Sequence, residues 1–175
     1  MTPNIINKSK SKSKNKCNRY QTKFSFGATS AIITNLGIIT GLDTLVHPKL
    51  SIIAGMLVVA LADNIADSFG IHIYQESECI DSKEVWFSTL CNFLTRVFVS
   101  LIFIVLVIVL PINLAVPFSI CWGLALLAIL SYAIARDRKV NPYLEIFKHV
   151  IIAILVIVLS HFAGKYIISN FKIAV

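Results

Sequence analysis

The stretch LSIIAGMLVVALADNIADSFGIHIY, residues 50–74, decides the fold because it is long and apolar enough to cross a bilayer. At about 1.5 Å per residue, a helix over this stretch exceeds the ~30 Å hydrocarbon core. Two acids, Asp63 and Asp67, lie within it one helical turn apart and therefore share a face. Ionisable groups at membrane depth are costly, so this pair predicts a functional site that faces protein or water.

The rest of the chain is similarly apolar. Of its 175 residues, 57% are hydrophobic and 14% are charged, and the mean hydropathy is +0.79. This composition excludes an ordinary water-soluble domain and predicts one all-α, polytopic membrane domain over residues 24–175 with five transmembrane helices. The spans are predicted at about 24–46, 50–74, 94–110, 116–135 and 147–168.

A basic tail, residues 1–23, precedes the first span and carries much of the net charge of +7. Its low-complexity segment NKSKSKSKNK has no apolar face, which predicts disorder. Attraction to anionic lipid explains the lysines, and nucleic acid is not an expected partner because no aromatic residues are interleaved. The distribution of Lys and Arg along the chain predicts a cytoplasmic N-terminus and a C-terminus on the opposite side.

The first span contains a stripe of small, weakly polar residues. Ser30, Thr34, Gly37 and Gly41 follow spacings of four, three and four, which favours close helix packing over direct contact with an ion. Asn35 is the most polar group at mid-depth, and it can cross-link helices or ligate a cation. Ser30, Thr34 and Asn35 are therefore candidates for a cation site, and the stripe is a candidate surface for a second copy of the chain.

The second span adds a possible soft ligand. Met56 shares a face with Asp63 and Asp67 by its spacing. The polar stretch QESECIDSKEVWFSTLCNF, residues 75–93, follows and predicts a connector at the membrane interface. Its Glu76 is a candidate for gathering cations at the entrance of a pathway.

Arg96 lies near the start of the predicted third span and has two interpretations. Its side chain can snorkel to the interface, which we favour slightly, or it can neutralise Asp67 or Glu76. The acid pair suits a cation such as Mg²⁺, Mn²⁺ or Fe²⁺, and without a cation it would hold one proton, as a proton-coupled exchanger requires. Because one subunit supplies few ligands, we expect a homodimer that joins through the first helix.

Enzyme chemistry has little support in the sequence. It contains no GxSxG, HExxH, P-loop or GxGxxG motif, and its four cysteines have neither zinc-site spacing nor a disulfide framework. Neither an enzyme nor a resident cofactor is expected. The alternative to transport is a non-transporting membrane protein in which Asp63 and Asp67 form a structural ion pair with Arg96.

Two segments, FGATSAIITNLGIITGL at 26–42 and IAGMLVVALADNIADSFGIHIYQESE at 53–78, form a pattern that resembles a known family. On these residues the chain resembles the vacuolar iron transporter family over roughly residues 26–78, and it is similar over the remainder only in hydropathy. The matching residues are Gly27, Thr34, Asn35, Leu36, Gly37, Gly41, Ala54, Gly55, Ala60, Leu61, Asp67, Gln75 and Glu76.

The resemblance implies a homodimer that moves Fe²⁺ or Mn²⁺ out of the cytoplasm in exchange for protons, along a path between the two first helices. Three positions depart from the family: Ser30 replaces an aspartate, Asp63 a methionine and Asp67 a glutamate. The family's long glutamate-rich cytoplasmic insertion is also missing. The family's methionine at the position of Asp63 would supply a thioether ligand, and its loss favours a harder ion. Met56 lies two turns away and is an alternative thioether ligand.

Overall fold

The computed structural model describes residues 26–171, and this part of the chain is helical without a strand, as the all-α prediction requires. A first helix, Phe26–Leu42, precedes α2 (Pro48–Ser77), α3 (Ser82–Val109), α4 (Ile112–Asp137) and α5 (Pro142–Phe171). The four labelled helices are each long and apolar enough to cross a membrane, whereas the first helix is shorter. The predicted basic tail, residues 1–23, lies outside the described residues.

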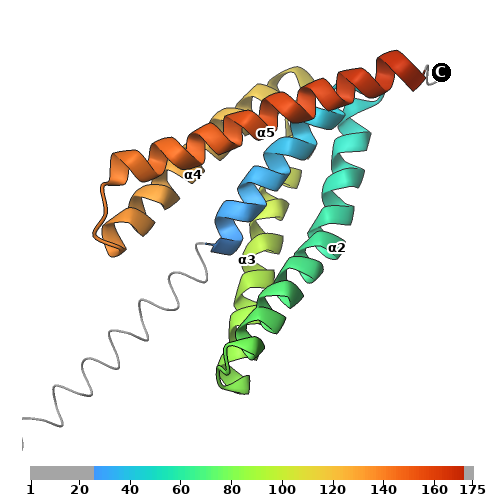
Figure 1. Ribbon diagram of the computed structural model, residues 1–175. Helices are drawn as coiled ribbons and strands as arrows, with labels where there is room; N and C mark the ends of the chain where they lie inside the picture. The colour runs from blue at the N-terminus through green and yellow to red at the C-terminus, as the bar shows by residue number, and fades with distance from the viewer. Residues whose placement is uncertain (1–25, 172–175) are drawn as a thin grey trace, which may run out of the picture.

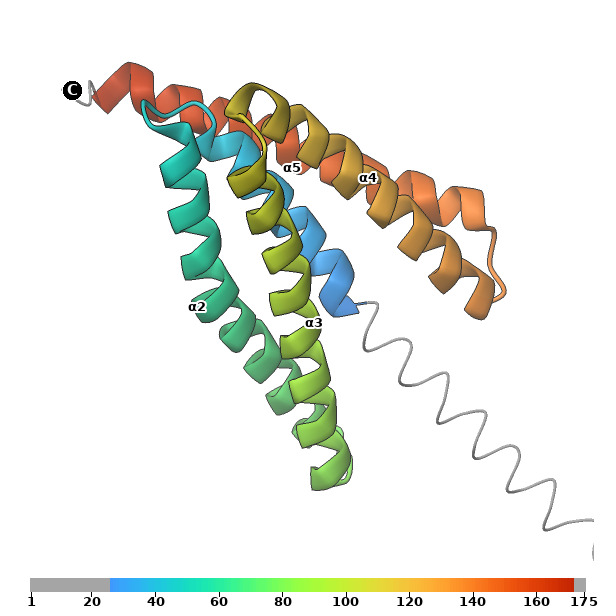
Figure 2. The same ribbon diagram turned by 180° about the vertical axis from the view of Figure 1, so that it is seen from behind.

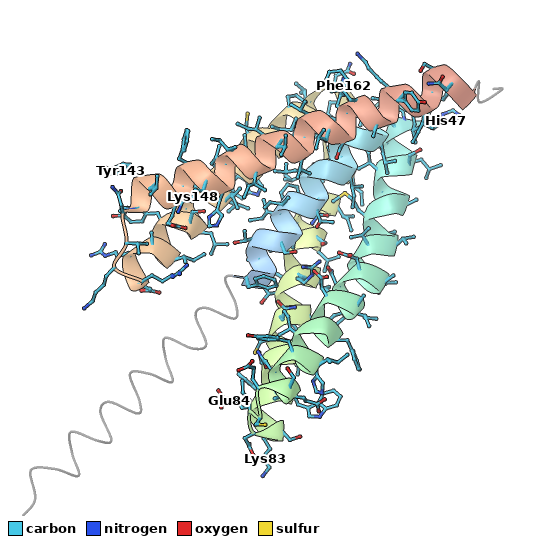
Figure 3. All side chains as sticks on the ribbon, viewed as in Figure 1. His47, Lys83, Glu84, Tyr143, Lys148 and Phe162 are labelled. Carbon is cyan, nitrogen blue, oxygen red and sulfur yellow. The ribbon has the colours of Figure 1, made fainter. Side chains whose placement is uncertain are left out.

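The helices form two hairpins with the first helix beside them. α2 and α3 are antiparallel, and α4 and α5 lie side by side and run obliquely to the α2–α3 pair (Figures 1 and 2). Prolines stand at the start of α2 and α5 and directly before α4, where the missing N–H costs no intrahelical hydrogen bond. Figure 3 places His47 and Lys83 at opposite ends of the α2–α3 pair.

The apolar core lies where the first helix, α2, α3 and α4 meet, and Ala153 of α5 also belongs to it. Leu36, Met56, Phe103 and Leu127 are completely buried in it. Gly123 of α4 allows this approach, because a Cβ there would stand only 2.8 Å from the Leu36 side chain. The apolar half of the α2–α3 pair is thus held by dense packing of side chains.

The other half of the α2–α3 pair is polar. The buried positions of α2 change from Ile52, Met56 and Ala60 to polar residues, and α3 shows the matching change in the opposite direction. We call the polar part the polar seam. It consists of Asn64, Ser68, His72 and Gln75 on α2 and Ser88, Thr89, Asn92 and Arg96 on α3.

Hydrogen bonds join the polar seam pair by pair. The Gln75 amide donates to Ser88 Oγ at 3.0 Å, His72 Nδ1 lies 2.9 Å from Thr89 Oγ1, and the Asn92 amide donates to Ser68 Oγ at 3.0 Å. These pairs explain why α3 begins at Ser82, whereas the apolar third span was predicted to begin near residue 94. Polar residues that pair across two helices allow helical structure in a stretch of low hydropathy.

The turn between α2 and α3 is short. Residues 78–81 reverse the chain, and Cys79 adopts the left-handed conformation with φ 53° that more often belongs to glycine at a helix end. Its N–H and that of Ile80 bond to the last carbonyl groups of α2. Lys83 and Glu84 therefore lie at the tip of a tight hairpin (Figure 3), within the stretch for which an interfacial connector was predicted.

Candidate functional site

The candidate site centres on Arg96, which lies near the middle of α3 and is completely buried. Its guanidinium contacts both acids of α2: Nη2 lies 2.7 Å from Asp63 Oδ2, and Nη1 lies 2.6 Å from Asp67 Oδ2. One helical turn separates the two acids, so a single guanidinium fork reaches both carboxylates. We refer to Asp63, Asp67 and Arg96 as the acid–arginine cluster.

Two neutral groups hold the guanidinium in place. Arg96 Nε donates to Asn64 Oδ1 at 2.8 Å, and Nη1 also donates to Ser30 Oγ on the first helix at 2.6 Å. The Asn64 amide donates to the Ala60 carbonyl, which leaves its oxygen directed at Arg96. The prediction that Arg96 snorkels is therefore wrong, because its side chain finds four polar partners at mid-helix and is not exposed.

The charges of the cluster are unequal. Two carboxylates face one guanidinium, so the cluster carries one net negative charge when both acids are ionised. Each aspartate side chain is 43% exposed, although the Arg96 side chain that contacts them is not exposed at all. At the middle of helices that are long enough to span a bilayer, this surplus charge calls for one more positive charge or for a covering partner.

Of the other predicted ligands, only Ser30 joins the cluster. Its hydroxyl accepts from Arg96 and lies 3.4 Å from Asp67 Oδ2. Met56 is instead part of the apolar core, with no exposed surface. Glu76 lies closer to the α2–α3 turn, where its carboxylate is 3.3 Å from His72 Nε2.

The remaining two predicted ligands belong to other helix contacts. Asn35 donates to Ser100 Oγ of α3 at 3.0 Å and to the carbonyl of Ala31, so it cross-links the first helix and α3. Thr34 lines a groove between the first helix, α2 and α5. Within residues 26–171, no group of three or more His, Cys, Asp and Glu side chains is arranged to share a metal ion.

The glycine stripe of the first helix packs against α5. A Cβ at Gly37 would stand 3.0 Å from Val156, and one at Gly41 would stand 3.3 Å from the Ser160 carbonyl oxygen. Gly164 of α5 also lies against Gly41, so the two backbones approach closely. This is the close packing that the GxxxG spacing predicts, and it occurs within one chain. The two glycines are therefore packed against α5 on one side, and together with Thr34 they also line the groove between the first helix, α2 and α5.

Comparison of the chain with protein-family models, with curated proteins and with solved structures gives no match.

Of the two interpretations of Arg96, the less favoured one is observed: Arg96 pairs with Asp67, and also with Asp63, whereas Glu76 lies beside His72. The bond to Asn64 was not predicted. A signal for the burial of Arg96 and for this bond was present in the sequence. Asn64, Ser68 and His72 recur every four residues on α2, and Asn92 and Arg96 do so on α3. Two antiparallel helices with such matched polar stripes bury them against each other, because the hydrogen-bonding groups have no other partner in an apolar setting.

Proposed function

We propose that this protein is an integral membrane transporter that moves a cation in exchange for protons, with the acid–arginine cluster as the exchange site. The observation that carries the proposal is the pairing of two carboxylates with one guanidinium at mid-helix. A purely structural ion pair at this depth needs only one acid. The second carboxylate adds a negative charge that a proton or a cation can balance in turn.

Fe²⁺ or Mn²⁺ is the proposed cargo, moved out of the cytoplasm, as the resemblance to vacuolar iron transporters implies. The donors that the cluster offers are oxygen atoms of Asp63, Asp67, Ser30 and Asn64, which suit a divalent cation of this kind. With Arg96 in place, a divalent cation would leave the cluster with a net charge of +1. The proposal therefore requires the Arg96 guanidinium to move away from the site when the metal ion binds, so that the two carboxylates balance the charge of the divalent cation.

A homodimer is part of the proposal. The half-exposed carboxylates of Asp63 and Asp67 form the surface that a second copy would cover, because carboxylates at mid-helix are costly to leave against lipid. Two copies would bring four carboxylates and two guanidinium groups together around one two-fold axis. Because Ser30 of the first helix lies 3.4 Å from Asp67 Oδ2, the contact would include α2 together with the first helix.

A second candidate function follows from the same arginine. Arg96 is fully buried and its Nε, Nη1 and Nη2 atoms all have acceptors, which is the arrangement of a structural ion cluster in a non-transporting membrane protein. In that case Asp63 and Asp67 serve only to neutralise Arg96. Their loss would then lower stability without any flux to lose.

Flux into proteoliposomes separates the two functions. Uptake of Mn²⁺, Fe²⁺ and Mg²⁺ is measured with and without a pH gradient, for the wild-type chain and for Asp63→Asn and Asp67→Asn. Glu78→Gln is the matched control, because Glu78 is an exposed acid in the α2–α3 turn. We expect gradient-dependent flux of Mn²⁺ or Fe²⁺ in the wild type and in the control and its loss in both cluster variants. Absence of flux for every ion in the folded wild type would refute transport.

A further inference from the structure

The turn between α4 and α5 is basic. Arg136, Arg138 and Lys139 are exposed there, and a single acid, Asp137, lies among them. Within residues 26–171, none of these three basic side chains forms an ion pair. We call Arg136, Arg138 and Lys139 the basic tip. Its positive charge exceeds the negative charge beside it and is available to a partner from outside the described chain.

Backbone hydrogen bonds fix the shape of this turn. The Lys139 N–H donates to the Arg136 carbonyl at 3.2 Å, and the Val140 N–H donates to the Ala135 carbonyl at 3.0 Å. Lys139 adopts the left-handed conformation, with φ 56°, that often ends a helix. Asn141 Oδ1 accepts a hydrogen bond from an N–H group in the first turn of α5. The basic tip is therefore presented by a compact turn rather than by a long loop.

An exposed apolar face of α5 begins directly beside the basic tip. Tyr143 is 79% exposed, more than any other large apolar side chain in the described part of the chain, and Phe147 is exposed one helical turn further on. Of residues 142–170, only Ala153 and Gly164 are buried. Tyrosine at the end of a membrane-spanning helix typically lies at headgroup level. The basic tip, just beyond Tyr143, is thus expected at the depth of the lipid phosphate groups.

The turn between α2 and α3 has the opposite charge. It lies on the same side of a membrane as the basic tip, because α2 to α5 are each long enough to cross and are joined by short turns. Glu78, Asp81 and Glu84 stand there against one base, Lys83. The ends of the two hairpins lie apart (Figures 1 and 2). An anionic partner on this side would be attracted to the basic tip and repelled by the α2–α3 turn.

We propose that the basic tip binds the headgroup of an anionic phospholipid in the leaflet on its side of the membrane. The lipid phosphate would accept charge-assisted hydrogen bonds from the two guanidinium groups and from the lysine. The acyl chains would lie along the exposed face of α5, against Tyr143 and Phe147. With the predicted orientation this is the cytoplasmic leaflet, whose anionic lipids attract basic segments beside membrane-spanning helices.

Two tryptophan reporters allow the lipids at the two turns to be compared. The chain contains two tryptophans, Trp86 and Trp122. Tyr143→Trp, combined with Trp86→Phe and Trp122→Phe, leaves one tryptophan beside the basic tip. Trp122→Phe alone leaves Trp86, which is exposed near the start of α3 and close to the acids of the α2–α3 turn.

Quenching by brominated lipid tests the proposal in bilayers of equal parts phosphatidylcholine and phosphatidylglycerol. Only one of the two lipids is brominated at a time, so the ratio of the quenching reports which lipid contacts the tryptophan. At position 143 we expect phosphatidylglycerol to be favoured at least about threefold, and the preference should fall as the ionic strength rises. At Trp86 we expect no preference for the anionic lipid.

Two double variants in the position-143 reporter separate the basic tip from net charge. Arg138→Gln with Lys139→Gln removes two charges from the basic tip and should abolish the preference for phosphatidylglycerol. Lys83→Gln with Lys165→Gln is the matched control, because both lysines are exposed and lie outside the basic tip. The control lowers the net charge of the chain by the same amount and should leave the preference unchanged.

Three results would overturn the proposal. The first is equal quenching by the two lipids at position 143, and the second is an unchanged preference in the folded Arg138→Gln, Lys139→Gln variant. The third is weak quenching by both lipids, which would show that protein, such as the acidic turn of a second copy, covers the basic tip. The inference goes beyond the proposed transport and does not rest on it, because lipid contact is measured without flux.

Discussion

Replacing Arg96 by methionine removes the one positive charge of the acid–arginine cluster and keeps a side chain of comparable length. The change leaves Asp63 and Asp67 facing each other at mid-helix without their guanidinium, and it leaves Asn64 Oδ1 and Ser30 Oγ without their donor. Removing one partner of a buried ion pair costs about 3–5 kcal/mol in other proteins. The half exposure of the two carboxylates places the expected loss at the lower end of that range, about 3 kcal/mol.

The free energy of unfolding is measured by titrating dodecyl sulfate into dodecyl maltoside micelles and following helix content by circular dichroism. At about 1.4 kcal/mol per factor of ten, the loss corresponds to a decrease of roughly a hundredfold in the folding equilibrium constant. Arg136→Met is the matched control, because Arg136 is exposed in the last turn of α4. We expect the control to change the free energy of unfolding by less than about 0.5 kcal/mol.

A compensating variant identifies the cause of the loss. Adding Asp63→Asn and Asp67→Asn to Arg96→Met removes all three charges while keeping side chains of similar size. Most of the lost stability should return, because replacing a buried ion cluster as a whole is often close to neutral. The assignment of Arg96 as the buried counter-ion is refuted if Arg96→Met destabilises the chain no more than Arg136→Met does.

Three further predictions concern helix packing, the predicted ligand of the first helix and orientation. Gly164→Ala should destabilise the chain by about 1–3 kcal/mol, because its Cβ would collide with the first helix. Gly70→Ala should be neutral or should stabilise the chain by up to about 1 kcal/mol. The same unfolding titration checks both variants, and equal effects would contradict the close packing of α5 against the first helix. Asn35→Leu should lower the free energy of unfolding by about 1 kcal/mol, because Asn35 loses its hydrogen bond to Ser100 of α3. Flux into proteoliposomes should be unchanged, and a loss of flux would indicate that Asn35 is a cation ligand. Orientation is tested in sealed vesicles with an impermeant maleimide and two single-cysteine chains. A chain whose only cysteine is Cys79 should be labelled from the cytoplasmic side, and a chain whose only cysteine replaces His47 should be labelled from the opposite side. Labelling of both chains from one side would contradict the predicted orientation.

Hydropathy is sufficient to predict the helices and their order because each apolar run is long and the connections are short. The shared face of Asp63 and Asp67 also follows from spacing alone, since a helix places residues i and i+4 together. These features depend on local sequence. They do not require knowledge of which helix packs against which.

Pairing between helices is what the sequence leaves open. A hydropathy window reads Ser88, Thr89 and Asn92 as surface residues, although each bonds to a partner on α2 and lies inside a helix. Arg96 looks like an interfacial residue for the same reason, because polar residues such as Asn92 and Thr95 precede it at the predicted start of the span. The oblique course of α4 and α5 depends on the shapes of the packed surfaces, and nothing in their local sequence predicts it.

The most direct test of the exchange site is difference infrared spectroscopy of the chain in nanodiscs before and after addition of Mn²⁺. A protonated carboxyl group has a C=O stretching band that a carboxylate lacks, so the spectrum reports whether a metal ion displaces a proton. We predict that Mn²⁺ removes such a band in the wild type and that the change is absent in the Asp63→Asn, Asp67→Asn double variant. A spectrum without loss of a carboxyl band, or the same loss in the double variant, would contradict cation–proton exchange at the acid–arginine cluster.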